Sequence, residues 1–140
     1  MKGTRVEVGR WGEAAAESYL SEKGYRIIGR NVRTPYGEID LVALQETALQ
    51  PGGRRDTNFE PVLVFVEVKT RTGKLFGPPE VAVNRRKQEH MLASAQAYLQ
   101  SQPEQDLDWR VDVIAVQVER GRVKPVITHF ENALSGIEPD

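Results

Sequence analysis

Cysteine is absent from the 140 residues, so neither a disulfide framework nor a thiolate zinc site can form. The first thirty residues hold no apolar run long enough for a signal peptide or a membrane span. We therefore expect a soluble, cytoplasmic protein with no membrane partner. Net charge is also small, because 19 Lys and Arg residues face 20 Asp and Glu residues, and this balance argues against a strongly basic nucleic-acid binder. The length and the 39% hydrophobic content fit one α/β domain over residues 1–140.

Apolar residues spaced by three and four predict a first helix over residues 6–23, and Gly24 stands where a left-handed cap would end it. Trp11 falls on the apolar face of this helix, so we assign it to the core, together with Trp109. A second helix is predicted over residues 84–102, with its first residue, an asparagine, as the N-cap.

Runs of β-branched and aromatic residues bounded by turn residues predict strands in the rest of the chain. The expected order is α-β-β-β-α-β, with or without a last strand, in a mixed central sheet. Residues 45–61 contain a Pro-Gly-Gly run and no periodicity, so they are predicted to form a flexible loop. The predicted strands cover residues 25–33, 38–44, 62–71, 109–118 and 123–130.

Two of these apolar strands are interrupted by acids, Asp40 in one and Glu67 in the other. An ionised carboxylate inside a buried strand costs several kcal/mol unless it is paired or binds a metal. If the two strands are neighbours, Asp40 and Glu67 reach the same place. Glu38 shares the face of Asp40, so either acid could serve there. Carboxylate oxygens with no nearby His or Cys suit Mg²⁺ or Mn²⁺ better than zinc.

Two further residues extend this acidic site. Residues two apart in a strand share a face, so Lys69 projects beside Glu67. At about 100° per residue, Glu13 lies at the border of the apolar arc of the first helix, whereas Glu17 points further toward solvent. Glu13 is the better candidate to face the sheet, and the alternative is that both glutamates are surface acids of an amphipathic helix.

Three cations, Arg85, Arg86 and Lys87, follow the predicted N-cap of the second helix. Cations at this end oppose the helix dipole, so the position suggests binding of an anion such as phosphate. The alternative is a solvated, charged turn. Arg71 and Lys74, just past the acidic strand, could add contacts to a nucleic-acid backbone.

Two other groups of polar residues receive no catalytic role. Arg110 and Asp112 are two apart on one strand and are predicted to form a structural pair. His90 and His129 have no metal-ligand spacing and no partner motif.

These residues resemble the PD-(D/E)xK nuclease superfamily and, within it, the YraN-type family of bacterial proteins. The resemblance implies a restriction-endonuclease-like fold, similar to that of archaeal Holliday-junction resolvases, in which a glutamate precedes a Gly-aromatic pair as Glu13 does here. The proline of the superfamily pattern is missing before Asp40. The matching segments are Gly12-Glu13, Lys23-Gly24-Tyr25, Arg30-Asn31-Val32-Arg33, Gly37-Glu38-Ile39-Asp40-Leu41, Phe65 to Arg71, Lys87 and Arg110-Val111-Asp112-Val113.

The resemblance implies metal-dependent hydrolysis of nucleic-acid phosphodiesters. Asp40 and Glu67, with Glu13 directly or through water and the Val68 carbonyl as a further candidate, would hold one or two Mg²⁺ or Mn²⁺ ions. Lys69 would orient or deprotonate the attacking water. DNA is favoured, with branched DNA in repair or recombination as one option, and junction-cleaving relatives suggest a homodimer. The alternative is a non-catalytic nucleic-acid-binding or interaction module that keeps the nuclease fold.

Overall fold

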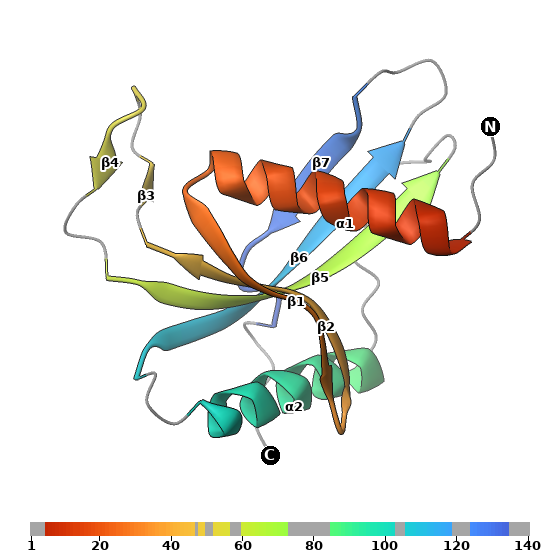
Figure 1. Cartoon of the computed structure of the whole chain (residues 1–140), viewed down its shortest axis with the longest axis vertical. Coiled ribbons are helices and arrows are strands. Elements are labelled where there is room, and N and C mark those ends of the chain that lie inside the picture. The colour runs from red at the N-terminus through yellow and green to blue at the C-terminus, as the bar shows by residue number, and fades with distance from the viewer. Residues whose placement is uncertain are drawn as a thin grey trace.

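A computed structural model describes residues 5–46, 48–49, 52–56, 60–72, 85–102, 106–118 and 124–134. The predicted order of a helix, three strands, a helix and two strands is confirmed for the principal elements, with one small hairpin added (Figure 1). Along the chain the elements are α1 (Arg5–Glu22), β1 (Tyr25–Thr34), β2 (Gly37–Gln45), β3 (Ala48–Leu49), β4 (Arg55–Asp56), β5 (Val62–Thr72), α2 (Arg85–Ser101), β6 (Asp108–Val118) and β7 (Val126–Phe130).

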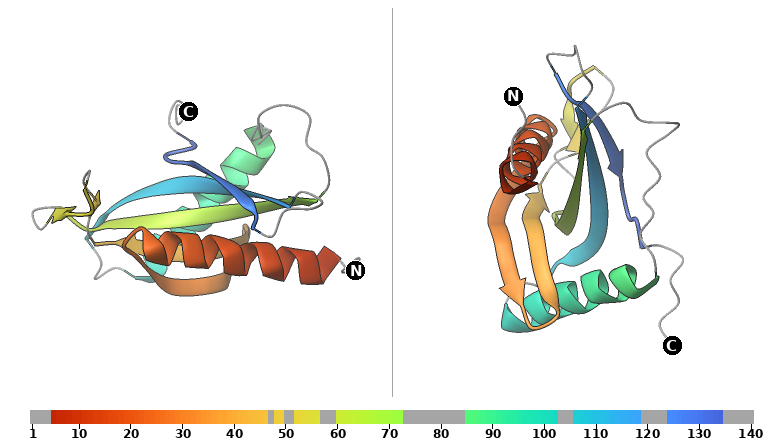
Figure 2. Two further views of the ribbon diagram at one scale, coloured as in Figure 1. Left: turned by 90° about the horizontal axis from the view of Figure 1, so that it is seen from above. Right: turned by 90° about the vertical axis from the view of Figure 1, so that its right-hand side faces the viewer.

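Five strands form one mixed sheet in the order β1-β2-β5-β6-β7. Neighbouring strands run antiparallel except β5 and β6, which are parallel and have α2 between them in the chain. Helix α1 covers one face of the sheet and α2 covers the other (Figure 2). The predicted α/β fold, with a mixed central sheet flanked by helices, is therefore confirmed. Within the described residues, neither helix is long and apolar enough to cross a membrane.

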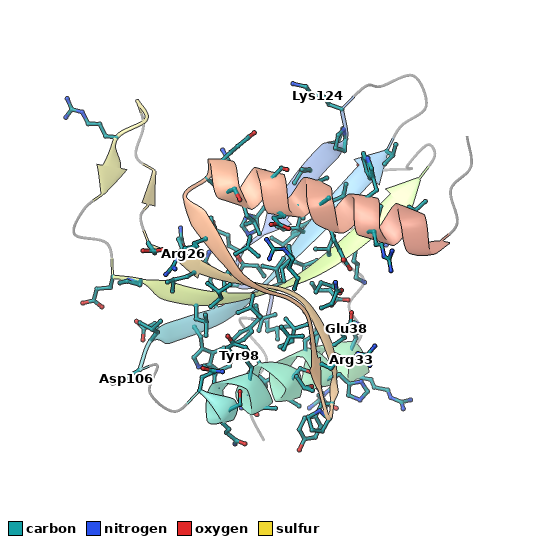
Figure 3. All side chains as sticks on the ribbon, in the orientation of Figure 1. Arg26, Arg33, Glu38, Tyr98, Asp106 and Lys124 are labelled. Carbon is teal, nitrogen blue, oxygen red and sulfur yellow. The ribbon has the colours of Figure 1, made fainter. Side chains whose placement is uncertain are left out.

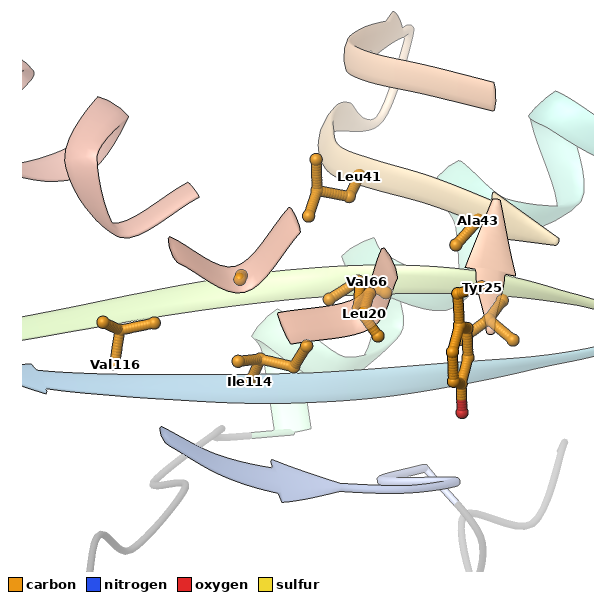
Figure 4. Close-up of a cluster of buried hydrophobic side chains, with 9 residues drawn as sticks. Leu20, Tyr25, Leu41, Ala43, Val66, Ile114 and Val116 are labelled. Carbon is orange, nitrogen blue, oxygen red and sulfur yellow. The ribbon is translucent and has the colours of Figure 1, made fainter. Parts of the chain in front are cut away.

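The core has two layers because successive strand residues point to opposite faces of the sheet. The central strands β2, β5 and β6 are buried on both faces, as expected where helices cover both sides. Beneath α1 lie Ala16, Leu20, Tyr25, Leu41, Ala43, Val64, Val66, Ile114 and Val116 (Figure 4). Beneath α2 lie Ile39, Val42, Leu63, Phe65, Ala95 and Val111.

Helix α1 contacts the sheet through Gly12, Ala16 and Leu20, which recur every four residues and are buried. A Cβ atom at Gly12 would collide with the side chain of Thr70 on β5, so only glycine permits this close approach. The assignment of Trp11 to the core was wrong, since its side chain is 43% exposed. The spacing of apolar residues had placed Trp11 on the apolar face, whereas small residues one position further along make the contact with the sheet.

The segment at 45–61 differs from its prediction as a loop. Within it β3 and β4 pair antiparallel, and Gly52 and Gly53 between them have φ of 90° and 81°. This hairpin was missed because two-residue strands are too short to show a period of two. Asn84, the predicted N-cap of α2, lies outside the described residues, whereas Gly24 ends α1 with φ of 93°, as predicted.

Strand β1 forms one edge of the sheet. Its pairing with β2 shifts register between Ile27 and Gly29, so one extra residue bulges out of the strand. Arg26, Arg30 and Arg33 of this strand are exposed. Arg26 pairs with Glu46 and Arg30 with Glu17, so the edge of the sheet is irregular and lined by charged side chains.

Candidate functional site

The predicted acidic site lies where β2 and β5 separate. The antiparallel pairing of the two strands ends at Leu41↔Val66, although both strands continue beyond it. Asp40 and Glu67 are the first residues past this last pair. The Val68 N–H donates a hydrogen bond to Asp40 Oδ2 at 2.8 Å. A carboxylate oxygen thus accepts the main-chain hydrogen bond of a β5 residue that no longer pairs with β2. This holds Asp40 at the point where β2 and β5 separate, which we call the opening.

Strand β2 rotates locally at Asp40. Ile39 packs in the cluster beneath α2 and Leu41 in the cluster beneath α1, although residues two apart in a regular strand share a face. On the neighbouring strand, Asn31 has φ of 48°, a left-handed conformation that asparagine tolerates better than most residues. The Asn31 side chain hydrogen-bonds Glu13 of α1. The irregularity in the β1–β2 hairpin therefore also connects the site to the first helix.

Glu67 stands on a regular part of β5. Val66 packs toward α1 and Phe65 toward α2, so alternation places Glu67 and Lys69 on one face, as the sequence predicted, and that face is the α2 side. Only 14% of the Glu67 side chain is exposed, and its Oε1 lies 3.0 Å from Lys87 Nζ of α2. A buried carboxylate on the sheet is thus ion-paired with a lysine from the first turn of a helix.

The two glutamates of α1 are both half-buried but have different partners. Glu17 forms an ion pair with Arg30 at the surface, with Arg30 Nε 3.0 Å from Glu17 Oε2. Glu13 is half-buried, and burial is the main reason why its pKa is raised. The negative charges of Glu38 and Glu67 add to this rise. Glu13 is therefore the helix residue that belongs to the electrostatic environment of the site.

Asp40 is the most perturbed of the acids. Its pKa is raised to about 7, chiefly by burial and then by the negative charge of Glu67, with a smaller contribution from Glu13. The hydrogen bond from Val68 and the charge of Lys87 act in the opposite direction and do not compensate. Ionisation of Asp40 near neutral pH is thus costly unless a further positive charge is supplied.

The other predicted cations lie on the same two elements as Glu67 and Lys87. Arg71 is exposed near the end of β5, and Arg85 and Arg86 are exposed in the first turn of α2. Arg85 Nε lies 3.4 Å from Glu89 Oε1 one helical turn away. Lys74 falls in the stretch 73–84, which is outside the described part of the chain.

A small pocket of about 20 Å³ opens beside Glu67, which is room for about one water molecule. It lies between the sheet and α2, and Glu38, which is labelled in Figure 3, also contributes to its wall. A water-sized group can therefore stand next to the Glu67 carboxylate. The lining residues are Glu38, Ile39, Phe65, Val66, Glu67, Met91, Ser94 and Val111.

The donor set suits one kind of metal site. Among the described residues, no group of three His, Cys, Asp or Glu side chains is close enough to hold an ion. Asp40 and Glu67 supply two carboxylates. The charge of Glu13 acts on Asp40 more weakly than that of Glu67. Mg²⁺ commonly uses one or two carboxylates and completes its octahedron with water and substrate phosphate. The residues present fit that mode and do not form an all-protein cage.

A second polar cluster, around Asp112 of β6, is structural. Asp112 is fully buried, and its oxygens receive Arg110 Nε at 2.9 Å, the Asn132 N–H at 2.8 Å and His129 Nε2 at 2.7 Å. Burial alone would raise its pKa, but these hydrogen bonds outweigh burial and lower it. Arg110 also donates to the Tyr25 hydroxyl at 2.8 Å. The predicted Arg110–Asp112 pair is confirmed, and it ties β6 to β1 and to the turn after β7.

Three contributors to the site were not predicted in these roles. Gly12 lets α1 approach the sheet, Asn31 connects Glu13 to the β1–β2 hairpin, and Lys87 pairs with Glu67 rather than standing apart from the acids. All three occur in the segments that carry the family resemblance. Their spacing along the chain gives no sign of these contacts, which depend on where the helices lie on the sheet.

Comparison with known proteins gives a family match over most of the chain. The model of "Uncharacterised protein family UPF0102" matches residues 12–116. A UPF0102 protein of Syntrophomonas wolfei is 42% identical over 127 residues, covering 91% of this chain and 96% of the relative. One from Syntrophotalea carbinolica is 41% identical over 129 residues and covers 92% of each chain. One from Thermodesulfovibrio yellowstonii is 39% identical over 129 residues, covering 92% and 96%.

Proposed function

The chain belongs to the uncharacterised protein family UPF0102, as the resemblance to the YraN-type family predicted, and we propose that it is a metal-dependent nuclease. The reaction is hydrolysis of nucleic-acid phosphodiester bonds. The observation that carries the proposal is the pair Asp40 and Glu67 at the opening between β2 and β5, where burial and mutual repulsion raise the pKa of Asp40 to about 7. Such acids need a cation close by.

Each residue of the site has a separate task in this reaction. Asp40 and Glu67 would hold Mg²⁺ or Mn²⁺, which supplies a Lewis acid for the phosphate and an acidified water. Glu13 adds negative charge to the field and positions water around the site. Lys69, on the same side of β5 as Glu67, orients the attacking water and balances charge that develops on the phosphate oxygens.

Cations near the opening favour a polyanionic substrate. Arg71 on β5 and Arg85 and Arg86 in the first turn of α2 are exposed. Arginine side chains and helix amide groups bind phosphate oxygens well. We propose DNA in preference to RNA, with branched DNA as the form that the similarity to junction resolvases favours, and a homodimer as the form that would cut two strands symmetrically.

One observation favours a rival function. Lys87 Nζ lies 3.0 Å from Glu67 Oε1, so part of the acidic charge is balanced without any added ion. A protein of this fold could therefore bind nucleic acid, or assemble with other proteins on it, without cleaving it. Cleavage that depends on a divalent ion distinguishes the two functions, because a binding module needs such an ion at most for affinity.

The test is a cleavage panel of linear, nicked, flapped and four-way DNA and RNA with Mg²⁺ or Mn²⁺. The parent is compared with Asp40→Asn and Glu67→Gln, and with Glu60→Gln as a control acid that is exposed ahead of β5. We expect cleavage by the parent and the control and its loss in the two site variants. Metal-dependent cleavage that persists in Asp40→Asn, or none by the parent on any substrate, contradicts the proposal.

A further inference from the structure

Lys87 is a positive charge in the acidic site that the sequence pattern had assigned to phosphate binding instead. It reaches from the first turn of α2 to Glu67, with Nζ 3.0 Å from Oε1. Its charge also lowers the pKa of Asp40, so its field covers both acids. One ammonium group therefore acts on the two carboxylates that the proposed function assigns to the metal.

The two partners of this ion pair are held very differently. The Glu67 side chain is 14% exposed, whereas the Lys87 side chain is 47% exposed. A lysine in the first turn of a helix gains nothing from the helix dipole, which disfavours cations at that end. Its side chain is flexible and half-exposed, so the ammonium is already partly hydrated and can move into water at little cost in free energy. Glu67 is fixed by the sheet, whereas the Lys87 ammonium stands at the end of a half-exposed side chain.

A divalent ion and the ammonium group would compete for the same carboxylate. An ion bound to Glu67 and Asp40 would stand within a few ångströms of Lys87 Nζ in its present place. Like charges at such separations repel strongly, and partial burial weakens the screening by water. The lysine ammonium is the group that withdraws, because its side chain is half-exposed and water can solvate it.

We propose that Lys87 is the internal counter-ion of the acidic site and that a divalent cation displaces it from Glu67. This inference rests on the proposed function, since it concerns the same metal. The displaced ammonium then joins Arg85 and Arg86, which precede it in the chain, on a face suited to substrate phosphate. Metal and nucleic acid thus strengthen each other's binding, because the metal releases a side chain that the phosphate then captures.

The experiment is calorimetric titration of the intact protein with Mn²⁺ in the absence of nucleic acid. The variant Lys87→Met removes the charge and keeps the length of the side chain. Lys124→Met is the matched control, because Lys124 is exposed and lies at the opposite end of the molecule from α2 (Figure 3). Lys87→Arg keeps the charge. We expect the Kd for Mn²⁺ to fall on the order of tenfold in Lys87→Met and to stay near the parent value in the other two variants.

Thermal unfolding gives a second, independent measurement. In EDTA, Lys87→Met should have a lower Tm than the parent, because Glu67 has lost its partner. Mn²⁺ should raise the Tm of Lys87→Met more than that of the parent. Equal Kd values for the parent and Lys87→Met overturn the inference and leave the proposed function standing. No Mn²⁺ binding by the parent or by Lys87→Met overturns the proposed function itself.

Discussion

The Asp40 side chain has two roles, one as a hydrogen-bond acceptor that joins two strands and one as an acid with a raised pKa. Its carboxylate accepts the Val68 N–H where β2 and β5 part, and burial with the charge of Glu67 raises its pKa from 3.8 to about 7. The folded protein therefore binds the Asp40 proton more tightly than the unfolded chain does. Stability attributable to this group is present below about pH 4 and is lost as the pH rises to about 7.

Asp40→Asn should accordingly stabilise the metal-free protein. Asparagine keeps an oxygen acceptor for the Val68 N–H and removes the charge. Above pH 7 we expect a gain in the free energy of unfolding on the order of 2 kcal/mol, shrinking toward pH 4. Urea unfolding in EDTA at several pH values measures the difference. A gain that is the same at pH 4.5 and pH 8 would show that ionisation of Asp40 is not its cause.

Lys69 allows metal binding to be separated from chemistry. In Lys69→Met both acids remain, so Mn²⁺ should still bind in a calorimetric titration. Cleavage should fall on the order of 100-fold, because the attacking water loses its positioning group. Asp40→Asn should instead lose both binding and cleavage. Loss of Mn²⁺ binding in Lys69→Met would place this lysine in the structure of the metal site rather than in the reaction.

The sequence was informative about the acids and uninformative about their surroundings. Asp40, Glu67 and Lys69 could be placed together because strand alternation and the pairing of adjacent apolar strands follow from local pattern. The left-handed Asn31 could not be foreseen, since asparagine adopts that conformation only at particular irregularities. Lys87 depends on where α2 lies against the sheet, which no local pattern fixes.

Among the elements, α1 lies against the sheet at a distance that depends on the small size of Gly12. Gly12→Ala would drive a methyl group into Thr70, so the helix would have to move away from β5. We expect a loss of about 1–3 kcal/mol in the free energy of unfolding, as for other overpacked contacts. Chemical denaturation measures it. Because Glu13 follows Gly12 directly, cleavage by the folded variant should fall as well.

Gly9→Ala is the matched control on the same helix. Nothing lies within 4 Å of a Cβ atom at Gly9, so the new methyl group has space. Alanine favours the helix over glycine by about 1 kcal/mol, and we expect a small gain in stability with cleavage unchanged. A similar loss in both variants would mean that the contact with Thr70 is not the cause.

Element boundaries followed the sequence where burial is regular and departed from it elsewhere. Strands β2, β5 and β6 were predicted to within one residue at each end because helices cover both of their faces. The hairpin of β3 and β4 carries no such pattern. In α1 the buried stripe passes through Gly12 and Ala16 rather than Trp11, since close contact with a sheet selects small residues over large ones.

For the molecule as a whole, the two polar clusters have opposite electrostatic character. Asp112 has a lowered pKa, so its stabilising contribution is present above the usual aspartate value of 3.8 and is lost as the pH falls further. Around Asp40 and Glu67 the charge is under-compensated, as a ligand site requires. The first cluster holds strands together, and the second is left with charge to satisfy.

Asp112→Asn tests this division. The variant leaves Arg110 and His129 facing a neutral side chain in a buried place, and we expect a loss on the order of 3 kcal/mol at pH 7. Denaturant unfolding measures the loss, and Mn²⁺ titration below the unfolding transition should give the parent Kd. A large change in Kd would mean that the two clusters are coupled through the sheet.

The bulge and the three exposed arginines of β1 have a consequence for the protein at high concentration. A flat, uncharged edge strand would offer its unpaired main-chain N–H and C=O groups to another copy of the protein and so promote aggregation. Here the bulge breaks the ladder between Ile27 and Gly29, and a second copy would have to accommodate the arginines and the ion pairs that Arg26 and Arg30 make with Glu46 and Glu17. Self-association by strand pairing at this edge is therefore disfavoured.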